Sequence, residues 1–77
     1  MTTLEEFRRN LIYYRKQCHL TQDDLAKQLH VSRSAIAQWE NGLVWPATPQ
    51  LLRLCVTLQI SCTQLLEESP PSSDSTE

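Results

Sequence analysis

Apolar residues recur along this chain at spacings of three and four, and polar residues fill most of the positions between them. That period is typical of amphipathic helices, in which one face is buried and the opposite face meets water. The first helix is expected from about Leu4 to Cys18, because Thr3 and Glu6 have the spacing of a capping box at its start. The apolar positions of this helix are Leu4, Phe7, Leu11, Tyr14 and Cys18.

Two further helices are predicted in the middle of the chain. Thr21 and Asp24 have the spacing of a second capping box. Ser32 is a favourable N-cap, and the helix that it starts is expected over 32–41, before a glycine of the kind that commonly ends helices. The inward-facing positions of these two helices are Leu25, Ala26, Leu29, Ala35, Ile36 and Trp39.

Two more helices are expected after a short loop. Thr48 is predicted to cap the fourth, with Pro49 at its first helical position, and Ser61 with Gln64 opens a short fifth helix. The apolar residues of these helices are Leu51, Leu52, Leu54, Cys55, Leu58, Leu65 and Leu66. The whole chain has one glycine, whereas hairpin turns and phosphate-binding loops depend on several. The sequence therefore predicts an all-α fold.

The composition of the chain changes near residue 67. The stretch 67–77 has two prolines, four serines and no large apolar residue, so a disordered acidic tail is expected after one folded domain over 1–66. The domain holds all seven basic residues against five acidic ones, a net +2, and the four acids of the tail bring the whole chain to −2. The acidity lies in the tail, so it does not exclude a nucleic-acid partner for the domain.

Several classes of protein are not supported by the residues present. No apolar run approaches the ~18 residues that span a bilayer, and no secretory signal is visible, so no membrane partner and a cytoplasmic location are expected. Cys18, Cys55 and Cys62 lack zinc-site spacing and are expected to be small buried apolar groups in a reducing compartment. No nucleophile, paired carboxylate or phosphate loop indicates an enzyme, so catalytic residues, a metal and a cofactor are not expected.

The most specific signal is the segment LTQDDLAKQLHVSRSAIAQWENG, residues 20–42, which strongly resembles the Xre/Cro-type family of phage-repressor-like regulators. The residues that carry the resemblance are Gln22, Ala26, Val31, Ile36 and Trp39, and it extends over about residues 7–66. It implies a compact five-helix lambda-repressor-like domain with a helix-turn-helix formed by the second and third helices. It also implies a sequence-specific transcriptional regulator, expected to be a repressor that binds a palindromic operator on double-stranded DNA as a homodimer.

The resemblance also assigns roles to individual residues. Arg33, Ser34 and Gln38 match positions that contact bases in the major groove, where Arg suits guanine and Gln suits adenine. Gln22 matches a position that holds a backbone phosphate, with Thr21 and Ser32 as helpers. The DNA-binding set is therefore Thr21, Gln22, Ser32, Arg33, Ser34, Ala37 and Gln38.

Two other pairs of residues can be compared with the family pattern, and one matches it while the other departs from it. Arg15 and Glu40 match a structural pair that ties the first helix to the recognition helix. His19 and His30 replace glycines of the family, so each is expected in the left-handed region of φ and ψ, which His tolerates at some energetic cost.

The loop after the recognition helix departs furthest from the family. Leu43, Val44 and Trp45 stand where basic or polar residues often meet the DNA backbone. Such residues indicate either a protein interface or a tryptophan that folds over the core with Pro46. The first possibility leaves open an alternative function, in which the fold is an antitoxin or antirepressor-like interaction module. A nonspecific DNA binder is disfavoured by the low positive charge, and a dimer would use this loop or the last two helices.

Overall fold

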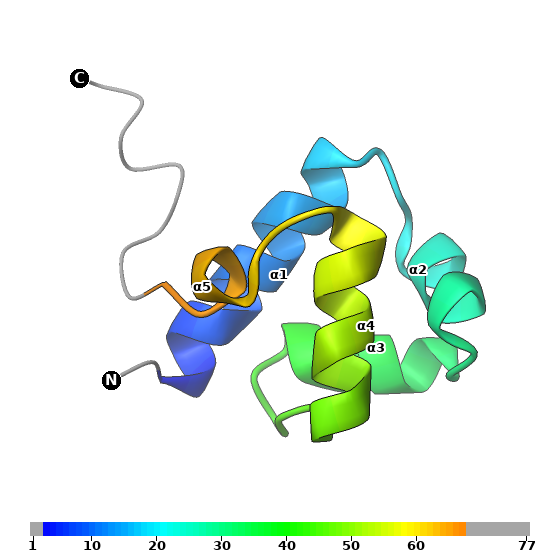
Figure 1. Ribbon diagram of the computed structural model, residues 1–77. Coiled ribbons are helices and arrows are strands. Elements are labelled where there is room, and N and C mark those ends of the chain that lie inside the picture. Colours follow the sequence, from blue (N-terminus) through cyan, green and yellow to red (C-terminus); the bar gives the residue numbers. More distant parts are fainter. Residues whose placement is uncertain (1–2, 68–77) are drawn as a thin grey trace.

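The structure is a computed structural model that describes residues 3–67. Five helices and no strand occur in that range, namely α1 Leu4–Gln17, α2 Gln22–Leu29, α3 Arg33–Glu40, α4 Thr48–Leu58 and α5 Cys62–Leu65 (Figure 1). The predicted all-α architecture with its helix-turn-helix is confirmed. The expected disordered tail lies outside the described residues, apart from Glu67.

Four of the five helices start at the residues that the sequence indicated. The capping boxes at Thr3, Thr21 and Ser61 are all formed, and the Ser32 side chain accepts a hydrogen bond from the backbone N–H of Ala35 at 3.1 Å. These bonds satisfy backbone donors that have no partner within the helix itself. Local hydrogen bonding therefore sets these boundaries.

The start of α4 corrects the prediction that Thr48 is its cap. Thr48 is the first helical residue, Pro49 follows inside the first turn, and the extended Ala47 is the N-cap without a side-chain hydrogen bond. The earlier start is possible because the backbone N–H that proline lacks is one of those left unpaired throughout the first turn. The C-terminal end of α1 also differs slightly, since Cys18 is its C-cap.

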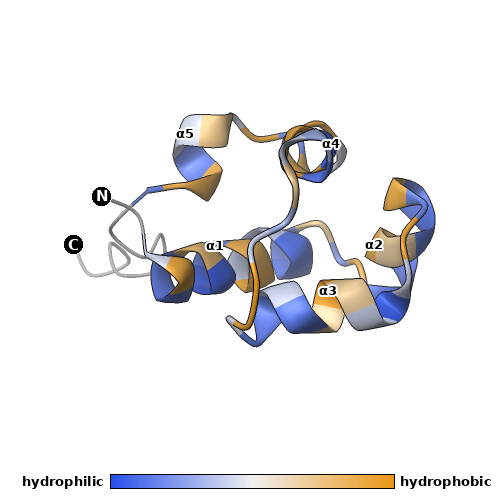
Figure 2. Cartoon of the chain, turned by 90° about the horizontal axis from the view of Figure 1, so that it is seen from below, coloured by the Kyte–Doolittle hydropathy of each residue, from blue (hydrophilic) through white to orange (hydrophobic). Residues whose placement is uncertain are grey.

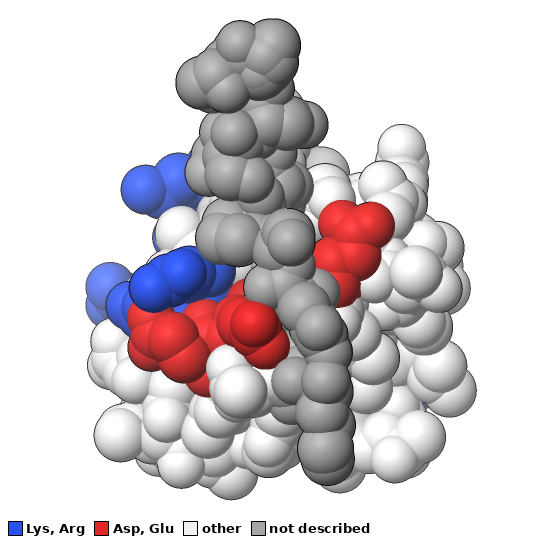
Figure 3. All heavy atoms as spheres, turned by 90° about the vertical axis from the view of Figure 1, so that its left-hand side faces the viewer, with Lys and Arg blue, Asp and Glu red and all other residues white. Residues whose placement is uncertain are grey.

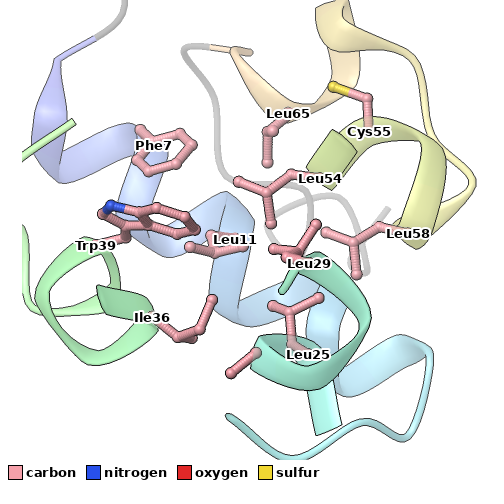
Figure 4. Close-up of a cluster of buried hydrophobic side chains, with 11 residues drawn as sticks. Phe7, Leu11, Leu25, Leu29, Ile36, Trp39, Leu54, Cys55, Leu58 and Leu65 are labelled. Atoms are coloured by element: carbon pink, nitrogen blue, oxygen red, sulfur yellow. The ribbon is translucent and has the colours of Figure 1, made fainter. Parts of the chain in front are cut away.

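The helices enclose one apolar core. Figure 2 shows α4 and α5 on one side of the domain and α3 on the opposite side, and in Figure 4 side chains from all five helices converge between them. The buried apolar residues are Phe7, Leu11, Leu25, Ala26, Leu29, Ile36, Trp39, Leu54, Cys55, Leu58 and Leu65. Nearly all of them are positions that the three- and four-residue spacing selected.

Three helices end in a residue other than glycine that has a left-handed backbone. His19, His30 and Gln59 have φ values of 58°, 59° and 59°. In each case the next residue donates its N–H to a carbonyl five positions back, at 3.0 to 3.2 Å, which closes the last turn. The expectation for both histidines is confirmed, and Gln59 adds a third position that the sequence did not reveal.

A buried asparagine joins the two ends of the domain. Asn10 is fully enclosed, and its Nδ2 donates to the carbonyls of Leu65 at 2.8 Å and Glu67 at 2.9 Å. Its Oδ1 has no hydrogen-bond partner among residues 3–67. The body of the domain therefore makes use of the backbone of Glu67, one residue beyond the limit that composition indicated.

Candidate nucleic-acid interface

The core holds α2 against α3 at a short distance, and this contact sets the geometry of the site. Ala26 on α2 is 3% exposed, so a longer side chain there would have to displace its neighbours in the core. Ile36 and Trp39 on the inner side of α3 are buried in the core. The opposite side of α3 is therefore directed to solvent.

The structure gathers most of the residues expected to contact DNA. Arg33, Ser34 and Gln38 on α3 are exposed, and Ala37 is half-buried beside them. A surface hollow of about 360 Å³ is lined by Gln22, Arg33, Ser34 and Ala37. Gln38 lies on the same helix one turn beyond Ser34 and does not line this hollow.

A second hollow connects the N-terminal ends of α2 and α3 to α1. Its volume is about 440 Å³, and its lining residues are Arg15, Thr21, Gln22, Asp23 and Arg33. Gln22 and Arg33 belong to both hollows, so the two form one continuous surface. This surface brings together side chains from Arg15 to Ala37, which stand up to 22 positions apart in the sequence.

The helix N-termini on this surface are suited to anions. The hydroxyl oxygens of Thr21 and Ser32 accept the capping bonds from Asp24 and Ala35, which leaves each hydroxyl hydrogen to be donated outward. The first-turn N–H groups and the helix dipole add partial positive charge at the N-terminus of α2 and at the N-terminus of α3. Together with Arg33, these groups can bind phosphate oxygens.

The predicted pair of Arg15 and Glu40 is formed and is largely buried. Arg15 Nε donates to Glu40 Oε2 at 2.5 Å and Arg15 Nη2 to Oε1 at 3.1 Å, with the two side chains 12% and 4% exposed. Arg15 Nη1 also donates to the carbonyl of Leu20 at 2.7 Å. The pair therefore fastens α3 to α1 and to the turn that precedes α2.

Gln22 has a partner that the sequence did not indicate. Its Nε2 donates to Glu40 Oε1 at 2.9 Å, so the side chain expected at a phosphate also belongs to the buried network. One amide hydrogen is used in this way, and the second remains to be donated to a ligand. No local pattern links residues 22 and 40, because they belong to different helices.

Arg8 is a second residue that sequence reasoning missed. Its Nε donates to the backbone carbonyl of Glu40 at 2.9 Å, and its stem lies across Gly42, where φ is +71°. A Cβ at Gly42 would stand 2.9 Å from Arg8 Cδ. Glycine is therefore favoured at this position both by the backbone conformation and by the side chain that crosses it.

The apolar loop after α3 is divided between the core and the solvent. Trp45 has its ring centroid 5.0 Å from that of Phe7, and Pro46 is buried. Leu43, in contrast, is 70% exposed, and Val44 and Trp45 each keep about two fifths of their surface in water. Trp45 and Pro46 thus cover the core, while Leu43 projects from the domain.

Several charged side chains on and around this surface are paired with one another. Glu5 pairs with Arg8 at 3.0 Å and with Arg9 at 3.2 Å, and Lys27 pairs with Asp23. Figure 3 shows acidic and basic side chains lying together on the face at the left of Figure 1. The Arg33 side chain takes part in no ion pair or hydrogen bond within 3–67, so its guanidinium is available to a ligand.

Two further features of the described residues bear on the kind of site. In that part of the chain, no three His, Cys, Asp or Glu side chains come together as a metal site would require. None of its helices has the length and apolar character needed to cross a membrane.

Two short helices joined by a tight turn, the second with an exposed polar face, define a helix-turn-helix domain. The chain belongs to the helix-turn-helix family, of the Xre/Cro type, whose sequence profile matches residues 11–65. It is 38% identical over 61 residues to the HTH-type transcriptional activator BcrR of Enterococcus faecalis. That match covers 79% of this chain but only 30% of the relative.

Solved structures show the same fold. The restriction-modification controller protein C.AhdI from Aeromonas hydrophila superposes with a TM-score of 0.75 and 27% identity, over 80% of this chain and 94% of that one. The hydroxypropylphosphonic acid epoxidase from S. wedmorenis gives a TM-score of 0.77 and 29% identity over 84% of this chain. Only 35% of the epoxidase is covered, so the domain also occurs as part of a larger enzyme.

Proposed function

We propose that this chain is a sequence-specific DNA-binding transcriptional regulator that places α3 in the major groove. The observation that carries the proposal is the continuous surface at the N-terminal ends of α2 and α3, where the unpaired Arg33, the first residue of α3, shares a hollow with Thr21 and Gln22 at the start of α2. The major groove is about 12 Å wide, and it admits an α-helix, whose diameter with side chains is about 10–12 Å. We propose that the protein binds DNA without catalysing a reaction and that it acts in the cytoplasm.

The proposed contacts fall into two classes. Arg33, Ser34 and Gln38 contact base edges, with Ala37 between them small enough to approach a thymine methyl group. Gln22 and the hydroxyls of Thr21 and Ser32 contact phosphates at the groove edge. Gln22 is suited to this role because its bond to Glu40 holds the amide in place while one hydrogen stays free.

We further propose that the active species is a homodimer on a palindromic operator and that it acts as a repressor. One domain offers a single short recognition helix, so two half-sites about one helical turn apart are needed for useful affinity. Bound over a promoter, such a dimer would block access to it. A reporter gene tests the sign directly, and increased expression would instead match the activator role that the name of BcrR states for that protein.

Site selection on random duplex DNA, followed by substitutions, tests the base contacts. Arg33→Ala and Gln38→Ala should each weaken binding to the selected site by ~1–3 kcal/mol and relax the preference at one base position per half-site. Affinity for unrelated DNA should fall much less, because that affinity comes from phosphate neutralisation. Gln17→Ala, at an exposed position of α1, is the matched control and should change neither.

The phosphate contact has a different signature. Gln22→Ala should weaken binding to every sequence by a similar factor, since a phosphate contact positions the protein without reading bases. If selection yields no consensus, or if Arg33→Ala and Gln38→Ala keep full specificity, the base-reading assignment is wrong.

The alternative function is a protein-interaction module. The observation that favours it is Leu43, which is 70% exposed beside Val44 and Trp45 on a loop that meets the end of α3. Leu43→Glu separates the two functions. It should leave DNA affinity unchanged for a regulator, and it should abolish complex formation for a module that binds another protein through this loop.

A further inference from the structure

Two of the three cysteines lie in contact at the joint between α4 and α5. The Cys55 thiol is 3.1 Å from Cys62 Sγ and donates a hydrogen bond to it. Cys55 lies three positions before Leu58, the last residue of α4, and Cys62 is the first residue of α5. The composition indicated three separate apolar thiols, and only the fold brings these two together.

We infer that Cys55 and Cys62 form a reversible thiol–disulfide switch that reacts with hydroperoxides and fastens α5 to α4. A disulfide has an S–S bond of about 2.05 Å, so the two sulfurs need to approach by only about 1 Å. The chain between them is the end of α4, through Leu58, and the three residues that lead to α5, and both thiols are free. Rotation about the side-chain bonds at a half-buried Cys62 can supply much of this movement.

The reaction is balanced with a hydroperoxide as the oxidant. The Cys62 thiolate attacks the peroxide oxygen, breaks the O–O bond and becomes a sulfenic acid, and the alcohol or water leaves. The Cys55 sulfur then attacks the sulfenic sulfur, forms the S–S bond and releases water, which takes up the Cys55 proton. Two thiols are oxidised by two electrons, and one peroxide is reduced.

The two cysteines have different roles because their surroundings differ. Cys62 is half-buried, so it can meet an oxidant from solution, whereas Cys55 is 5% exposed. Burial, with the hydrogen bond to Cys62 as a second cause, raises the pKa of Cys55 to about 12. Cys55 therefore remains a thiol in the resting protein and acts as the resolving partner. Cys18 donates to the carbonyl of Leu58 at 3.6 Å and takes no part.

The bond would act on the shortest helix of the described residues. A helix of four residues does not form alone, so α5 depends on the packing of Leu65 and on the bonds that Asn10 donates. Figure 4 places Cys55 beside Leu65 at one edge of the core, and Figure 2 shows α4 and α5 on the side opposite α3. Oxidation would therefore stiffen the domain and leave the proposed DNA-contacting surface unchanged.

The test is mass spectrometry of the full chain before and after hydrogen peroxide, with alkylation of the remaining thiols and tryptic digestion. No Lys or Arg follows Arg53, so one peptide, 54–77, contains both Cys55 and Cys62, while Cys18 lies in the separate peptide 17–27. After oxidation, 54–77 should lose two hydrogen atoms and take up no alkylating reagent, and a dithiol should restore both sites. The melting temperature should rise by about 5–15 °C.

Three variants complete the test. Cys18→Ser is the matched control and should keep the mass change and the thermal shift. Cys55→Ala and Cys62→Ser should abolish both within a chain that still folds, as judged by circular dichroism. The inference is overturned if 54–77 remains alkylated twice after oxidation, if it carries a sulfinic acid, or if the only disulfides join two chains.

Discussion

Glu40 is the residue on which the first three helices converge. Its carboxylate accepts hydrogen bonds from Arg15 on α1 and Gln22 on α2, and its backbone carbonyl accepts one from Arg8. The carboxylate is buried, so its bonds are made in a medium of low dielectric constant and cannot be replaced by water. One acidic side chain therefore positions α3 and orients Gln22 at the proposed DNA surface.

Removal of the Glu40 carboxylate should be strongly destabilising. Glu40→Ala leaves Arg15 buried without a counter-charge, and the free energy of unfolding should fall by ~3–5 kcal/mol in urea titrations followed by circular dichroism. The control is Glu5→Ala, which removes an exposed carboxylate from Arg8 and Arg9 and should change stability by ~1 kcal/mol or less. Equal effects of the two substitutions would contradict a buried role for Glu40.

At the level of elements, hydrogen bonds at the helix ends set most of the boundaries. The capping box of α2 is a clear case, because Thr21 and Asp24 each bond the other's backbone N–H at 3.0 Å. The hydrogen bonds from the backbone N–H and then the side chain of Thr21 lower the pKa of Asp24 below its usual value. The helix start that contributes to the proposed site is therefore sensitive to acid.

Asp24→Asn should make the stability less dependent on pH. Because the pKa of Asp24 is lower in the folded chain than in the unfolded chain, its stabilisation is fully present above the unfolded pKa. It is lost as the pH falls through the folded pKa. The melting temperature of the variant should be lower than that of the native chain at neutral pH, and the difference should close in acid. Gln28→Ala, at an exposed position of the same helix without a titratable group, is the control and should leave the pH dependence of stability unchanged.

Substitution of the left-handed residues at the helix ends is predicted to stabilise the domain, in contrast to the destabilising substitutions above. His30→Gly and Gln59→Gly should each raise the free energy of unfolding by about 0.5–1 kcal/mol, because glycine adopts a φ near 59° without a Cβ clash. Gln28→Gly, within α2, is the control and should lower it by about 1 kcal/mol. The urea midpoints measure all three. A loss of stability in His30→Gly would show that its side chain has a role beyond the turn.

At the level of the whole molecule, large apolar side chains are exposed on a helix as well as on the loop after α3. Leu52 and Val56 lie one turn apart on α4 and are 54% and 78% exposed. They line a hollow of about 400 Å³ with Gln28, His30, Arg53 and Thr57. Large exposed apolar patches are typical of protein interfaces. The surface of α4 is therefore the part of the domain best suited to contact a second copy.

We predict that the proposed homodimer uses this face of α4. Val56→Glu would place a charge in the interface, so sedimentation at micromolar concentration should show a monomer, and affinity for a two-half-site operator should fall. Leu43→Glu adds the same charge to the loop after α3 and should leave the dimer intact. A native chain that remains monomeric both with and without operator would contradict the prediction.

The sequence by itself determined the helices and the family. Three- and four-residue spacing, three capping boxes and one glycine are local features, and local hydrogen bonds and apolar faces are sufficient to specify where each helix starts and which side it buries. The residues of segment 20–42 indicated the helix-turn-helix, and the match over 11–65 confirms it. The prediction that Thr48 is the N-cap of α4 was wrong, because proline is tolerated at more than one position in the first turn.

Only the tertiary structure decided which distant side chains meet. Gln22 reaches Glu40, Arg8 crosses Gly42, and Cys55 contacts Cys62, and each contact depends on how two helices or a helix and a loop pack. The packing also divided the apolar loop, with Trp45 on Phe7 and Leu43 in solvent. Such contacts are fixed by the shape of the whole core, because periodicity assigns a residue to a face of its own helix but not to a partner on another element.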